Sequence, residues 1–256
     1  MIARLGPHHI LHQYGSYVLS AANPPSSSWF VQLKSICSQY SLPDPLSVLS
    51  SPSSKSSFKN TARSHVTDFW EAKLRDKASS LDSLCFFKAN FYSLNKPHPI
   101  WRTAGGNPFE VQKACVQAKM ISGRYRTCLL SRHWSGDSSG NCSLPTCRLS
   151  PTPGSLSHIL IDCPDLSPSR MRVFSLWAKY LQDKPTLLPL VRKYLSESDP
   201  TLYIQFLLDC SVLPDVIRET QLHGQSVLDS LFYLTRTLCF SIHKARFKLL
   251  GKWNIQ

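Results

Sequence analysis

Four potential metal-binding side chains between residues 142 and 163 constrain the fold of this chain more than any other feature of its sequence. They are Cys142, Cys147, His158 and Cys163, in the pattern Cys-x4-Cys-x10-His-x4-Cys. Zinc prefers thiolate sulfur and neutral imidazole nitrogen, and four protein donors complete its tetrahedral coordination. The pattern therefore predicts a structural zinc site, because no coordination position is left for a reacting water.

The residues between these four are consistent with such a site. Pro145 separates the first two cysteines, and the Pro/Gly-marked segment 151–154 follows them, as expected for a chain that must double back. His158 and Cys163 flank three apolar residues, so one short helical segment could hold both. A second interpretation stays open, because the chain has 9 cysteines and buried thiols often behave as small apolar side chains. The spacing is also less diagnostic than paired Cys-x-x-Cys motifs.

Further motifs lie on both sides of this cluster. They are Lys96-Pro-His-Pro-Ile-Trp101, Val116-Gln-Ala-Lys-Met-Ile-Ser-Gly-Arg-Tyr-Arg-Thr127, Arg132-His-Trp-Ser135, Cys142-x-Leu-Pro-x-Cys147, Leu156-x-His-Ile-Leu-x-x-Cys-Pro164 and Tyr233-Leu-Thr-Arg-Thr-Leu-Cys-Phe240. Together they resemble the C-terminal region that follows the reverse transcriptase in LINE-type, non-LTR retrotransposon polyproteins. The resemblance extends over most of the chain, and it implies that the four residues form a zinc knuckle used in handling the element's RNA or its target DNA.

The chain departs from that family in one important respect. Reverse transcriptases of the family need a paired-aspartate motif to hold two catalytic metals, and this sequence contains no Asp-Asp dipeptide. The length of 256 residues also leaves no room for the family's endonuclease. We therefore expect a detached C-terminal fragment that lacks polymerase activity. Two alternatives stay open: an inert or protein-interaction helical remnant of a decayed element, or an incomplete gene model of a full RNA-directed DNA polymerase whose true start is not Met1.

The charge of the chain favours an anionic partner. It has 29 Lys+Arg against 16 Asp+Glu, a formal net charge of +13, and electrostatic attraction of this sign is typical of nucleic-acid-binding proteins. Basic and aromatic residues close to the cluster in sequence are the first candidates for contact with RNA or DNA, since arginine can bind phosphate and aromatic rings can stack on bases. These candidates are Lys119, Arg124, Tyr125, Arg126, Arg132 and Trp134.

Apolar residues recur at three- and four-residue steps on both sides of the cluster, which predicts a mostly α-helical array around a small zinc knuckle. The expected regions are an irregular N-terminal segment plus a short helix (1–46), a Ser-rich linker (47–57), a helical region (58–122), the zinc knuckle (123–165) and a C-terminal helical region (166–256). The last helix is predicted over 226–251. Its cations accumulate toward the C-terminal end, where they suit the helix dipole or could meet nucleic acid, a membrane or an acidic partner.

Two weaker binding candidates occur outside this region. His8, His9 and His12 lie close together and could bind a metal, although surface histidines are the commoner outcome. Aromatic residues between 86 and 101 alternate with basic ones, a composition that serves base stacking on single strands but is more often found in a core.

The sequence lacks two motifs typical of enzymes. It has no phosphate-binding loop and no His-Glu-x-x-His, so we expect no independent catalytic activity. The odd number of cysteines and the absence of a long apolar N-terminal run favour a reducing intracellular compartment, nuclear or cytoplasmic, with no membrane span.

Overall fold

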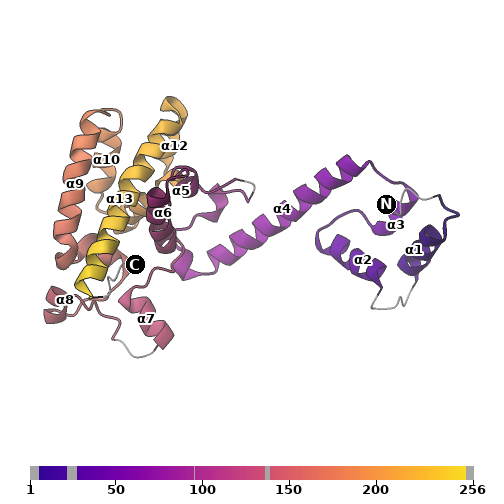
Figure 1. The fold of residues 1–256 in the computed structure, drawn as a ribbon, viewed down its shortest axis with the longest axis horizontal. Helices are drawn as coiled ribbons and strands as arrows, with labels where there is room; N and C mark the ends of the chain where they lie inside the picture. Colours follow the sequence, from indigo (N-terminus) through magenta and orange to yellow (C-terminus); the bar gives the residue numbers. More distant parts are fainter. Residues whose placement is uncertain (1–5, 22–27, 95, 136–138, 252–256) are drawn as a thin grey trace. The chain divides into compact units, whose positions relative to one another are not determined.

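The computed structural model of the protein describes residues 6–21, 28–94, 96–135 and 139–251, and most of these residues are helical (Figure 1). No β-strand occurs within these ranges, where one isolated antiparallel bridge joins Asn141 to Pro153. The predicted mostly α-helical fold is therefore confirmed. The chain divides into two compact units, the first within residues 1–76 and 93–95 and the second within residues 77–92 and 96–256.

The first unit is a small group of helices. It contains α1 (Ile10–Ser20), α2 (Trp29–Gln39), α3 (Pro45–Ser50) and most of α4 (Lys55–Ser79). Its core is formed by Val18, Leu19, Phe30 and Leu49, which are all buried. Such a core stabilises the unit modestly, since burying one large apolar side chain contributes about 1.5–3 kcal/mol.

This unit differs from the sequence-based expectation in two places. Helix α1 lies where we expected irregular backbone, because its apolar residues Val18 and Leu19 pack on the core while its serines bond back to helix carbonyls, as Ser20 Oγ does to Ser16 O at 2.8 Å. The expected Ser-rich linker at 47–57 is largely helical, since it includes the end of α3 and the start of α4. Asp44 begins α3 by accepting a hydrogen bond from Leu46 N at 2.7 Å.

The second unit holds the remaining helices and the predicted zinc ligands. Its α-helices are α5 (Pro99–Arg102), α6 (Pro108–Ile121), α7 (Cys128–Ser135), α8 (Pro145–Leu149), α9 (Ser167–Gln182), α10 (Leu188–Leu195), α11 (Pro200–Leu208), α12 (Pro214–His223) and α13 (Gln225–Leu249). Short 3-10 turns occur at Asp82–Leu84, Ala89–Phe91, Pro164–Leu166 and Cys210–Val212. Among the described helices, none combines the length and apolar character needed to cross a membrane.

Helix α13 is the centre of this unit. It packs against α6, α9, α11 and α12, and Figure 1 shows it beside α6 and α9. Leu231, Phe232, Leu238 and Ile242 are fully buried along its length. The helix was predicted from its three- and four-residue apolar spacing, and that spacing places these four side chains on the faces that its neighbours cover.

Buried polar contacts fix the register of α13 against the helices around it. Arg236, which is 2% exposed, bonds to Glu110 Oε2 at 3.1 Å and to Thr103 Oγ1 at 2.7 Å. Gln117 Nε2, on α6, donates to Thr235 Oγ1 of α13 at 3.1 Å. A buried polar group without a partner costs about 1–3 kcal/mol, so sliding α13 past α6 would be penalised at Arg236 and at Thr235.

Candidate metal centre

The first two predicted ligands lie on a loop that folds back on itself. Cys142 precedes α8 and Cys147 lies within it, with Pro145 at the first helical position. The returning segment pairs with the loop, because Cys142 N donates to Thr152 O at 2.8 Å and Gly154 N donates to Gly140 O at 2.9 Å. The turn predicted from the prolines and glycine of 151–154 is therefore present, and it holds both thiols on one side of the loop.

The other two predicted ligands lie at the ends of one π-helical turn, η4 (His158–Asp162). Its closing hydrogen bond runs from Cys163 N to His158 O at 2.7 Å. A π turn closes over five residues instead of four, so it brings residues five apart, such as His158 and Cys163, toward the same side. In an ordinary α-helix these two side chains would diverge, and the wider turn is what lets one short segment supply both donors.

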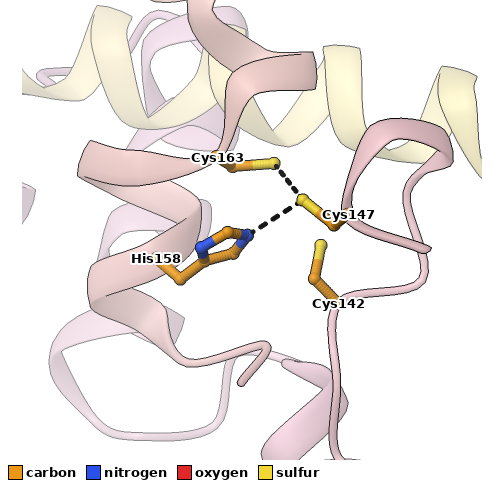
Figure 2. Close-up of side chains that lie close together, drawn as sticks. All are labelled: Cys142, Cys147, His158 and Cys163. Carbon is orange, nitrogen blue, oxygen red and sulfur yellow. Dashed lines mark hydrogen bonds between the residues drawn. The ribbon is translucent and has the colours of Figure 1, made fainter. Parts of the chain in front are cut away.

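The four donor atoms converge on one point (Figure 2). The sulfurs of Cys142, Cys147 and Cys163 and a ring nitrogen of His158 all lie within 4.8 Å of one another. Cys147 Sγ is 3.7 Å from Cys163 Sγ and 3.3 Å from His158 Nε2. Sulfurs about 2.3 Å from a tetrahedral zinc lie roughly 3.8 Å apart. The spacing of the donors therefore fits an ion of that size, and the cluster could hold a metal ion.

Burial shifts the pKa values of the clustered residues, and a bound metal would offset the shift of the thiols. Removal from water raises the pKa of the Cys147 thiol to about 12, with the neighbouring thiols adding to the effect. Burial likewise raises the pKa of Cys163 and lowers that of His158, so the imidazole is neutral at pH 7. A neutral imidazole is the form that binds a metal, whereas the buried thiols need a cation nearby before they lose their protons.

Two residues outside the four predicted ligands support the cluster: one links its two halves, and the other joins the segment that carries Cys163 to α9. Asp165, just after the last ligand, accepts hydrogen bonds from Thr146 N at 3.0 Å and Thr146 Oγ1 at 2.8 Å. Arg170, on α9, donates to Cys163 O at 2.6 Å and is 8% exposed. Sequence reasoning missed both residues, since neither spacing nor residue type distinguishes them from an ordinary helix start.

The other thiols of the chain do not form such a group. Cys37, Cys210 and Cys239 are also buried, yet within the described residues no second set of three or more potential donors comes together. The interpretation as scattered buried thiols thus applies to these residues and not to the cluster. The N-terminal histidines have other contacts: His9 caps α1 through Leu11 N at 3.2 Å, and His12 Nε2 lies 3.3 Å from Leu49 O.

The predicted nucleic-acid contacts fall into three groups. Lys119, Arg124, Arg126 and Arg132 are exposed and so could reach phosphate. Tyr125 is 4% exposed, its hydroxyl lies 3.3 Å from His243 Nδ1, and the Arg246 guanidinium covers its ring at 5.5 Å. The ring of Tyr125 is therefore not accessible to a base in this structure, because its side chain is almost entirely buried. Trp134 lies in α7, but its side chain falls outside the described part of the chain.

The fold and the site define a class: a mostly α-helical protein built around a buried Cys-Cys-His-Cys cluster that could hold a metal ion. The comparisons with known proteins add no family to this description. No protein-family model matches the chain, and neither a curated protein nor a solved structure matches it.

Proposed function

We propose that this protein is a zinc-stabilised nucleic-acid-binding protein, related to the region that follows the reverse transcriptase in LINE-type retrotransposon polyproteins and without polymerase activity of its own. The observation that carries the proposal is the convergence of Cys142, Cys147, His158 and Cys163 within 4.8 Å, in a chain whose formal charge is +13. The sequence resemblance supplies the link to retrotransposon proteins.

Zinc is the ion that best suits the donors. Three thiols and one imidazole form a soft, mixed set that zinc accepts in tetrahedral geometry, whereas calcium and magnesium require oxygen ligands. The four residues together would fill the tetrahedral coordination of zinc, so no coordination position is open to a substrate and the role of the ion is structural. Coordination would join the loop that carries Cys142 and Cys147 to the π turn and α9.

Phosphate is the part of RNA or DNA that this surface can bind. Lys119, Arg124, Arg126 and Arg132 are exposed, and such cations supply salt-dependent affinity with little sequence preference. We therefore expect binding to single-stranded RNA or DNA with weak discrimination among sequences. The burial of Tyr125 limits stacking to other aromatic residues.

Metal content and binding are tested on protein purified without chelator. Elemental analysis should find about one zinc per chain, as four converging ligands predict. Fluorescence anisotropy with a labelled single-stranded oligonucleotide at about 50 mM salt should show binding that weakens steeply as salt rises. Less than a tenth of an equivalent of zinc would remove the metal from the proposal. Zinc-loaded protein that binds no oligonucleotide would instead support the alternative of an inert or protein-interaction remnant.

The contribution of the surface cations is tested by substitution. Arg124→Ala combined with Arg132→Ala should weaken binding to all sequences alike and flatten the salt dependence by about two contacts. The matched control is Arg172→Ala combined with Arg192→Ala, which removes the same charge from exposed positions on α9 and α10. Equal losses in the two double variants would show that net charge, and not this surface, determines binding.

A further inference from the structure

A cleft of about 760 Å³ lies beside the metal-binding loop. Its lining includes three arginines, Arg126, Arg148 and Arg246, and we call it the arginine cleft. Cys142 and Cys147 form part of its wall, and Phe247 and Leu250 supply apolar surface. No acidic side chain belongs to its lining in the described part of the chain. Segments about 120 residues apart in sequence thus bring three cations to one concave surface.

Arg246 is the unusual member of this group, because it is only 5% exposed. Its Nη1 donates to Arg126 O at 2.6 Å, and its guanidinium lies over the rings of Tyr125 and Phe247. Within the described residues it has no carboxylate partner. A buried charge is costly unless it is paired. Arg236, which is similarly buried, has such a partner in Glu110 at 3.1 Å.

The two other arginines are exposed and accessible at the same cleft. Arg148 immediately follows a metal ligand, and its Nε donates to Ser143 O at 2.8 Å, which orients its guanidinium. The local field is positive: burial lowers the pKa of the His243 imidazole to about 4, and Lys119 and Arg246 contribute to the shift.

A bound metal would not cancel this charge. Zinc with three thiolates and a neutral imidazole carries a formal charge of −1, since two positive charges meet three negative ones. Three guanidinium groups line the cleft, so an excess of about two positive charges remains. The Cys128 thiol also lines the cleft. Burial alone would raise its pKa, but the contacts with Ser143, together with the charge of Arg246, outweigh burial and lower it; one thiolate could offset only one more charge.

We propose that the arginine cleft binds a phosphate group, with Arg246 as its buried anchor and Arg126 and Arg148 as its exposed contacts. This inference rests on the proposed function only for the kind of molecule to which the phosphate group belongs. A free nucleotide and a polynucleotide backbone present the same group to the same arginines, and guanidinium binds its oxygens in pairs. The volume of about 760 Å³ exceeds a single phosphate, so the attached nucleoside can enter as well.

The cleft also connects phosphate binding to the metal. Cys142 and Cys147 are ligands and wall residues at once, and Arg148 is the next residue after Cys147. Removal of the ion releases the loop from the π turn and so displaces one of the three arginines. Chelation should therefore weaken phosphate binding.

The test uses the full-length zinc-loaded protein and two probes, adenosine monophosphate in calorimetric titrations and a labelled single-stranded oligonucleotide in anisotropy. Arg126→Ala with Arg148→Ala should weaken the binding of both at least tenfold. Arg172→Ala with Arg192→Ala removes equal charge from exposed residues on α9 and α10 that do not line the cleft, and it should leave adenosine monophosphate binding within about twofold. Adenosine, which lacks the phosphate, should not compete.

The outcomes separate this inference from the proposed function. Nucleotide bound through the cleft but no oligonucleotide binding would retain the inference and overturn the proposed function. Oligonucleotide binding that the two double variants weaken equally, with no saturable binding of adenosine monophosphate, would overturn the inference and leave the proposed function in place. Both variants replace exposed side chains, and circular dichroism with zinc analysis verifies that they fold. Arg246→Lys then tests the anchor. This variant keeps the positive charge but loses the paired N–H donors of the guanidinium, and the affinity for adenosine monophosphate should fall at least threefold.

Discussion

Removal of the metal should destabilise the second unit by a measurable amount. The cluster lies at one end of that unit's core, where Cys142, Cys147 and Cys163 pack among apolar residues such as Leu144 and Leu160. The hydrogen bonds that Asp165 accepts from Thr146 join the two halves of the cluster at an exposed position. A bound metal would add a direct connection between the loop and the π turn inside the buried cluster.

The magnitude follows from linkage between binding and folding. A ligand that binds only the folded state stabilises it by RT ln(1 + [L]/Kd), about 4.1 kcal/mol when free ligand is a thousandfold above Kd. For a domain of 150–250 residues, each kcal/mol shifts Tm by about 2–4 °C. The second unit falls in this size range, since it spans residues 77–92 and 96–256. Chelation should thus lower its Tm by about 8–16 °C.

Circular dichroism melts with excess zinc and with a strong chelator measure this difference. Cys147→Ser should begin at the lowered Tm and no longer respond to chelator, because the site has lost a ligand. The matched control is Cys85→Ser, an exposed cysteine outside the cluster, and its response to chelator should equal that of the unsubstituted chain. An unchanged Tm after chelation of protein shown to contain zinc would refute the reasoning, since it would mean that the ion and the fold are not linked.

Two further predictions concern positions away from the ligands. Gly123→Ala should lower the free energy of unfolding by about 2–4 kcal/mol, measured by chemical denaturation, because Gly123 has φ +65° and an added Cβ would clash with the carbonyl oxygen of Ser83. Gly106→Ala is the control: an added Cβ there meets nothing within 4 Å, so its effect should be close to neutral. The pKa of His243 is lowered to about 4 in the folded chain, so the unfolded chain takes up a proton at this residue first as pH falls. The free energy of unfolding should therefore decline from about pH 6.5 to about pH 4. His243→Gln should flatten this part of the curve of stability against pH and leave the stability at pH 8 similar.

Local sequence chemistry accounts for part of the helical fold. Asn107 caps α6 by accepting from Phe109 N at 2.9 Å, and Gly123 follows the helix with the positive φ typical of a stop. The four clustered donors were predicted because donor type and spacing are visible in the chain itself. The π turn between His158 and Cys163 was not foreseen as such, since it packs against α13, a helix distant in sequence that no local pattern marks.

Contacts between distant segments account for the parts that were not predicted. Tyr125 was expected to stack on a base because it lies between two arginines in sequence, yet Arg246 and His243 of α13 cover it. Those partners are nearly 120 residues away, and no local pattern marks them. The helix α1 and the end of α3 within 47–57 were missed for a related reason: their few apolar residues, such as Val18 and Leu49, are covered by a shared core, and that contact is not visible in the local sequence.

The charge of α13 shows why composition gives an incomplete account of electrostatics. From sequence, its cations form one group that suits the helix dipole or meets an anion, but the structure divides them. Arg236 is buried with Glu110 and belongs to the core, while Lys244 and Lys248 are exposed. Arg246 is buried without a carboxylate among the described residues, at the arginine cleft. Arg236 and Arg246 are similarly buried, yet they have different consequences. The charge of Arg236, which is paired with Glu110, helps to fix the register of α13. The charge of Arg246, which is buried without a carboxylate partner beside an open cleft, favours the binding of an anion, and the net charge of +13 does not reveal this difference.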